Sequence, residues 1–198
     1  MLAGGRTAGQ LAFPAVFEAA FLPGTTIRQD STTLACSRLE PGRLRSETER
    51  LLAGDPITVA GQQAFTQHFP VGEFPVQLAL LRFGADQRVG FTRVLFDTAR
   101  VARWQLALRP GQAPLALRDS TFYCYGVDGG LGTFLDSVAN QALAARPAGA
   151  WEQAFFKPAE RPDFTGTIYR FDGHSIATFT TGLGDGCYLT YIGYGARG

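Results

Sequence analysis

The sequence predicts an α+β fold that is predominantly antiparallel β, built as a sandwich or a strongly curled sheet with a few packed helices. Its 198 residues are 45% hydrophobic and 18% charged, which suits one globular domain with a sizeable core. The chain also holds 16 Phe, 24 Gly and 11 Pro, a composition typical of short strands joined by tight turns. From residue 56 onward, several segments alternate apolar and polar residues, as half-buried strands do.

The N-terminal third predicts one helix and little else. We expect residues 1–13 to be frayed and residues 14–198 to form a single α+β domain. A proline at its start and apolar residues on one face predict a helix over 15–22, which a Pro-Gly pair ends. Residues 25–50 carry weak signals, with a turn at Pro41–Gly42.

The middle of the chain is rich in strand signals. A hairpin loop is expected at Gly84–Gln87, between two runs of alternating residues. The strands expected in this part of the chain are 57–60, 75–83, 88–96, 103–108 and 122–127.

The last third predicts one more helix and a meander of strands. Thr133 and Asp136 have the spacing of a capping box, which predicts a helix over 133–146. Residues 150–165 read as a connector whose aromatic residues, Trp151 among them, pack onto the body. An Asp-Gly pair between two strand-like runs predicts a hairpin joining 167–171 to 175–180, followed by a turn at 182–186 and a final strand over 187–194.

Charge and hydropathy argue against two classes of partner. The 18 basic and 17 acidic residues give a net charge of +1, whereas nucleic-acid binding normally needs a basic face. No apolar run approaches the roughly 20 residues that span a bilayer, and the N-terminus does not look like a secretory signal. We therefore expect no nucleic-acid partner, no membrane partner and a cytoplasmic location.

The cysteines Cys36, Cys124 and Cys187 are odd in number and widely spaced. This pattern favours three reduced, unpaired thiols over a disulfide framework or a zinc site. No cofactor and no metal are expected.

Two segments, Tyr125–Asp136 and Thr180–Tyr194, couple aspartate and glycine to aromatic residues between strand-like runs. Because ligand sites gather on loops held by a scaffold, we expect the two segments to be neighbours in space. The candidate ligand-binding residues are Asp128, Gly129, Gly130, Asp136, Asp185, Cys187 and Tyr188.

Each candidate chemistry has a structural alternative. Asp128, Asp136 and Asp185 would together suit a hard cation, but turn initiation and helix capping explain the same residues. The glycine-rich loop 126–132 precedes a predicted helix, as anion-binding loops do, yet it lacks the Lys-Ser/Thr of a phosphate loop.

Cysteine and tyrosine have two readings as well. Cys187 would be a nucleophile if His174 acted as its base and Asp172 or Asp185 oriented that base; otherwise it is a small core residue. Tyr188 and Tyr194 share a face of the last predicted strand, which suits either a half-buried sheet or an interface.

Further short motifs reinforce a family resemblance. Leu39-Glu-Pro-Gly-Arg43, Ala53-Gly-Asp-Pro56 and Gly72-Glu-Phe-Pro-Val76 precede the two aspartate-glycine segments. In this order, the set resembles the mostly bacterial domain-of-unknown-function family 4241 over about residues 15–194. That family has no known function, so the resemblance implies no catalytic residue.

The resemblance also bears on the C-terminus. Relatives usually continue through an Asp-Gly turn into one more strand, whereas this sequence has Gly195 and stops at Gly198. We therefore expect the final strand to expose an edge that forms a homodimer, unless residues 1–13 or another local strand cover it.

Two functional classes follow. The first is a non-enzymatic binding module of the bacterial cytosol for a protein or small ligand, favoured because the sequence shows no recognisable catalytic constellation. The second is a small hydrolase or transferase centred on the two Gly/Asp turns near Asp128 and Asp185.

Overall fold

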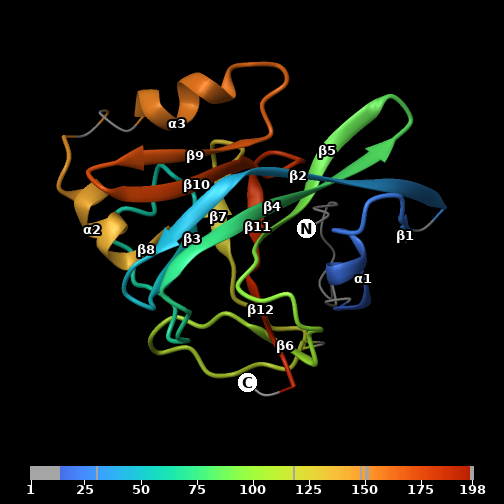
Figure 1. Ribbon diagram of the computed structural model, residues 1–198, viewed down its shortest axis with the longest axis horizontal. Coiled ribbons are helices and arrows are strands. Elements are labelled where there is room, and N and C mark those ends of the chain that lie inside the picture. The colour runs from blue at the N-terminus through green and yellow to red at the C-terminus, as the bar shows by residue number, and fades with distance from the viewer. Residues whose placement is uncertain (1–13, 30, 118, 148, 150–151, 197–198) are drawn as a thin grey trace.

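A computed structural model describes residues 14–29, 31–117, 119–147, 149 and 152–196. The predicted fold class is confirmed, since these residues form mainly antiparallel sheets accompanied by short helices (Figure 1). The expectations for residues 1–13 and for Trp151 fall outside the described residues. None of the helices in the described part of the chain combines the length and apolar character that crossing a membrane requires.

The first sheet has the strand order β1-β2-β4-β5. On the outer face of this sheet, apolar residues of β1, β2 and β4 pack against the segment that follows α1. The cluster includes Phe21, Leu34 and Leu81. The elements are α1 (Pro14–Ala19), β1 (Thr26–Gln29), β2 (Thr32–Ser46), β4 (Gly72–Phe83) and β5 (Asp86–Val94).

The weak signals over residues 25–50 conceal the longest strand. The predicted turn at Pro41–Gly42 is wrong, because β2 runs through it with a shift of register between Leu39 and Gly42. A bulge lets a strand carry a proline, which has no amide to donate to the ladder.

The second sheet has the order β3-β8-β10-β9, and two helices cover its outer face (Figure 1). Phe155 of the second of these helices is fully buried against Leu135, Leu143 and Ile176. The elements are β3 (Leu51–Gly54), β8 (Leu131–Asp136), α2 (Ser137–Ala144), α3 (Glu152–Ala159), β9 (Gly166–Phe171) and β10 (His174–Thr180).

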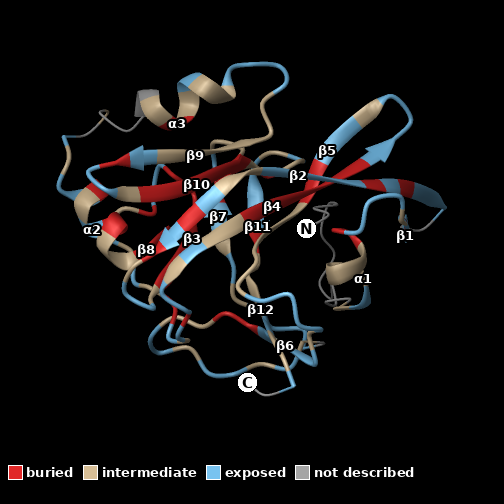
Figure 2. Cartoon of the chain, viewed as in Figure 1, coloured by how far each residue is buried: buried red, intermediate tan, exposed pale blue. Residues whose placement is uncertain are grey.

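The inner faces of the two sheets pack against each other as a sandwich. Leu44 and Val76 of the first sheet meet Ala177 of the second, and Leu78 meets Phe179. Figure 2 shows the buried residues concentrated on the central strands of both sheets.

The C-terminal strand differs from the prediction. It is divided into β11 (Gly186–Tyr188), which pairs with β7 (Tyr125–Val127), and β12 (Tyr191–Tyr194), which pairs with β6 (Arg103–Leu106). On one side, β11 and β12 each pair with another strand of this chain. Pairing with a local strand is the alternative to the unpaired C-terminal strand that the sequence suggested.

Three other predictions need correction. Thr133 does not cap a helix: it lies in β8, and α2 begins at Ser137 with Asp136 as its N-cap. The segment 57–60 is not a strand, because the amides of Thr58 and Val59 turn back to the carbonyl of Asp55. The connector 150–165 contains α3.

The predicted Asp172–Gly173 hairpin is confirmed. It joins β9 to β10, and both turn residues have positive φ, 46° and 83°. That backbone geometry belongs to the type I′ turn, for which Asp-Gly is the strongest sequence signal.

Candidate functional site

The two aspartate-glycine segments meet, as predicted. The amide of Gly130 donates to Asp185 Oδ1 at 3.1 Å, and the amide of Thr181 donates to the carbonyl of Gly130 at 3.0 Å. The pairing of β7 with β11 also holds the two segments together. We call Asp55, residues 128–130 and residues 181–188 the turn cluster.

Asp55 is the member of the turn cluster that sequence reasoning missed. It is 1% exposed, and one carboxylate oxygen accepts the amides of Asp128 at 2.8 Å and Gly129 at 3.3 Å. Its other oxygen accepts the amide of Ile57 at 2.7 Å. A side chain of the protein thus occupies the amides of the glycine-rich loop that would bind an anion. Its place in an Asp-Pro motif was the available signal.

Asp136 does not join the turn cluster. It ends the six-residue strand that begins just after Gly130, so about 20 Å of extended chain separates the two positions. Its buried carboxylate accepts the amides of Glu47, Thr48 and Val138 and the Thr48 hydroxyl, at 2.7–3.0 Å. Within the described residues, no group of three or more His, Cys, Asp or Glu side chains is placed to hold a metal ion.

Two tyrosines, Tyr125 and Tyr188, pack against the turn cluster. The buried Tyr188 donates its hydroxyl to the carbonyl of Gly184 at 2.6 Å, and its ring lies 6.2 Å from that of Tyr125. Burial raises the pKa of the Tyr125 phenol, and the neighbouring Tyr188 and Asp55 raise that pKa further. Burial also raises the pKa of Tyr188. Both phenols are therefore neutral at neutral pH and act as hydrogen-bonding and packing groups.

The cysteine prediction is wrong. Cys124 and Cys187 form a disulfide with a Cα–Cα distance of 5.6 Å, and Cys36 is a buried free thiol. The sulfur of Cys187 is therefore not available as a thiolate nucleophile in this structure. His174, its expected base, instead places Nδ1 2.8 Å from a carboxylate oxygen of Glu47. The disulfide also removes the support that unpaired cysteines gave to a cytoplasmic location.

Two glycines of the same turn allow a matched test of the turn cluster. Gly182 and Gly184 both have positive φ, 81° and 87°. A Cβ on Gly182 would overlap the carbonyl oxygen of Val89, whereas a Cβ on Gly184 meets nothing within 4 Å. We expect Gly184→Ala to lower the stability of the protein by about 1–2 kcal/mol, because alanine is strained at a positive φ. We expect Gly182→Ala to lose a further 1–3 kcal/mol, roughly, from the overlap.

Urea denaturation of the two glycine variants measures this difference. Equal losses of stability would contradict the close approach of the turn to β5.

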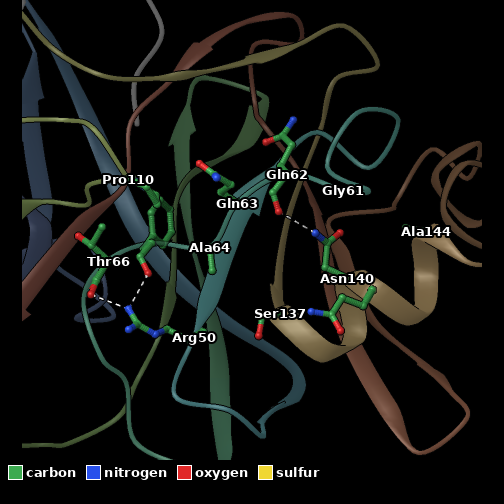
Figure 3. Close-up of a pocket in the computed structure, with 12 residues that line it drawn as sticks. Arg50, Gly61, Gln62, Gln63, Ala64, Thr66, Pro110, Ser137, Asn140 and Ala144 are labelled. Atoms are coloured by element: carbon green, nitrogen blue, oxygen red, sulfur yellow. Dashed lines mark hydrogen bonds between the residues drawn. The ribbon is translucent and has the colours of Figure 1, made fainter.

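A pocket of about 560 Å³ lies elsewhere, between α2 and the segment that leads away from β3 (Figure 3). Its volume is within the range of small-molecule sites. The lining residues are Arg50, Gly61, Gln62, Gln63, Ala64, Phe65, Thr66, Pro110, Ser137, Asn140, Gln141 and Ala144. We call this the α2 pocket.

One face of α2 forms a wall of the pocket. Ser137, Asn140, Gln141 and Ala144 have i, i+3, i+4, i+7 spacing and line it, while the opposite face buries Ala139 and Leu143 in the core. Asn140, the only asparagine in the chain, is 3% exposed and donates Nδ2 to the carbonyl of Gln62 at 3.1 Å. Its Oδ1 is buried and has no hydrogen-bond partner among the described residues.

Arg50 supplies the pocket's charge. Its Nη1 donates to the carbonyls of Thr66 at 2.7 Å and Phe65 at 3.3 Å, which fixes the guanidinium at one end of the pocket (Figure 3). This arginine was not singled out from the sequence. The polar stripe on α2 was the missed signal, and it was hidden by placing the helix start at Thr133.

The comparisons with known proteins place the chain in a family. Residues 44–198 match the family described as Protein of unknown function (DUF4241), and the chain belongs to that family. No curated protein and no solved structure matches it. The family resemblance expected from the sequence is confirmed.

Proposed function

We propose that this protein is a binding module whose small-molecule site is the α2 pocket. The observation that carries the proposal is the pocket itself: a concave space of about 560 Å³ lined by guanidinium, amide and hydroxyl groups beside apolar side chains. Ligand sites combine an apolar lining with a few placed polar groups in this way.

The turn cluster supports the small-molecule proposal less well. The carboxylates of Asp55 and Asp185 already accept the amides of residues 128–130. The Tyr188 hydroxyl already donates to the carbonyl of Gly184. The exposed side chains around it, Ile57, Asp128 and Leu183, favour a protein partner as the second candidate. A hydrolase or transferase at these turns has no support from the oxidised Cys187.

Blocking the α2 pocket tests the proposal. Ala144 is an exposed lining residue at the end of α2, and Ala145 follows it outside the pocket. We expect Ala144→Trp to fill the space and Ala145→Trp to leave it open. A library of small acids, amides, sugars and amines is screened by thermal denaturation and ligand-observed NMR. A ligand at ten times its Kd should raise the Tm of the parent protein and of Ala145→Trp by about 3–6 °C.

The same ligand should leave the Tm of Ala144→Trp unchanged. Ligands that stabilise both tryptophan variants equally, or a library that gives no ligand sensitive to Ala144→Trp, would overturn the proposal.

A homodimer is a separate proposal. β12 pairs on one side with β6, and no strand of the described residues pairs with its other side. Exposed strand edges readily pair with another chain. Light scattering on a size-exclusion column at about 100 µM, well above the Kd of typical weak interfaces, should show twice the monomer mass. A mass of 21.3 kDa would contradict the dimer.

A further inference from the structure

The charge that lines the α2 pocket is of one sign. Arg50 is the only charged side chain among its lining residues, and no carboxylate lines it in the described part of the chain. A half-buried positive charge with no carboxylate among the lining residues favours a ligand that brings a negative group. A cationic ligand would be repelled by Arg50 and would find no carboxylate among the lining residues to pair with.

Two hydrogen bonds hold the guanidinium of Arg50 and leave its Nε and Nη2 without a hydrogen-bond partner among the described residues. Nη1 is engaged with the carbonyls of Phe65 and Thr66, which fixes the guanidinium plane. A guanidinium carries five N–H donors in a planar fork, so Nε and Nη2 offer further protons. That fork matches the two oxygens of a carboxylate and bonds it more strongly than it bonds a neutral acceptor.

The other end of the pocket is neutral and polar. Figure 3 places Asn140 on the side of the pocket away from Arg50, with Ser137 between them. The hydroxyl and amides of this wall accept and donate hydrogen bonds but carry no charge. The Oδ1 of Asn140 is buried, so the accessible polar groups of this wall are those of the half-buried Ser137 and the exposed Gln141. A ligand with hydroxyl groups, which donate and accept, complements this wall.

We infer that the α2 pocket binds a small hydroxylated carboxylate, with the carboxylate on Arg50 and the hydroxyl groups toward α2. This inference rests on the proposed function, since it names the ligand class of the same pocket. Arg50 acts as the residue that selects charge, and the polar face of α2 selects hydroxyl-bearing ligands over apolar ones of the same size.

The test uses hydroxy acids of three to six carbons, each with its amide and its amine counterpart. Isothermal titration of the intact protein should give a carboxylate affinity about tenfold above that of the matched amide, with the amine weakest. Raising the salt concentration should narrow that difference, because it screens charge. Arg50→Met should reduce carboxylate affinity to that of the amide, whereas Arg50→Lys should retain part of the preference. Arg82→Met, an exposed arginine outside the pocket, is the control.

The outcomes separate the two proposals. If an amide or amine binds as tightly as its acid, and Ala144→Trp abolishes that binding, the ligand class is wrong and the pocket stands. If acids bind equally well to Ala144→Trp, or if Arg50→Met leaves a folded protein with unchanged preference, the inference fails. If no compound of either collection binds in the pocket, the proposed function fails with it.

Discussion

Asp136→Ala should destabilise the protein by about 3–5 kcal/mol, the largest effect we expect from a single substitution. The carboxylate is fully buried and accepts four hydrogen bonds, from three backbone amides and the Thr48 hydroxyl. Removing it leaves the donors unpaired, and each donor that water cannot reach costs about 1–3 kcal/mol of stability. It also removes the N-cap of α2, which contributes about 1 kcal/mol. Urea denaturation followed by circular dichroism measures the loss.

Asp128→Ala is the matched control. Asp128 is exposed, and its contact with Asp55 is made by the backbone amide, which the substitution retains. Its stability should stay within about 0.5 kcal/mol of the parent protein. Similar losses for the two variants would show that Asp136 does not hold residues 47–48 to α2. The comparison also separates two aspartates that the sequence alone placed in one candidate site.

The fold class could be predicted because it depends on local signals. The Asp172–Gly173 turn announces its hairpin, since few residues accept positive φ at two successive positions. By contrast, β2 was not predicted, because a proline and glycine within a strand look like a turn when the bulge that accommodates them is unknown. The start of α2 was misplaced for a related reason. Thr133 has the chemistry of a cap, but pairing with two neighbouring strands keeps it in β8.

The candidate site was predictable only in part. The meeting of residues 128–130 with Asp185 was predicted from similar motifs on neighbouring loops. The role of Asp55 was not, because it depends on a contact across 73 residues of chain. The α2 pocket was missed for the same physical reason: its walls come from Arg50, residues 61–66, Pro110 and α2, which only the packing of the sheets brings together. Periodicity reports which face of an element is polar, not which distant segment faces it.

The Cys124–Cys187 disulfide should contribute about 4 kcal/mol to stability. It closes a loop with a sequence separation of 63 residues, and in the chain-entropy account a loop of that length restricts the unfolded chain by about this amount. It also joins the end of the irregular segment before β7 to β11, beside the turn cluster. Denaturation with and without a reductant, and of the Cys124→Ser/Cys187→Ser variant, measures the difference.

Thiol counting tests the same assignment independently of stability. Denatured under non-reducing conditions, the protein should expose one thiol, that of Cys36, and after reduction it should expose three. Cys36→Ala is the control: it should remove the single thiol and leave the stability still sensitive to reductant. Because both bridged cysteines are exposed, a reductant reaches the disulfide without prior unfolding. Three thiols before reduction, or identical stability with and without reductant, would contradict the disulfide and return the cysteines to the unpaired state that their spacing suggested.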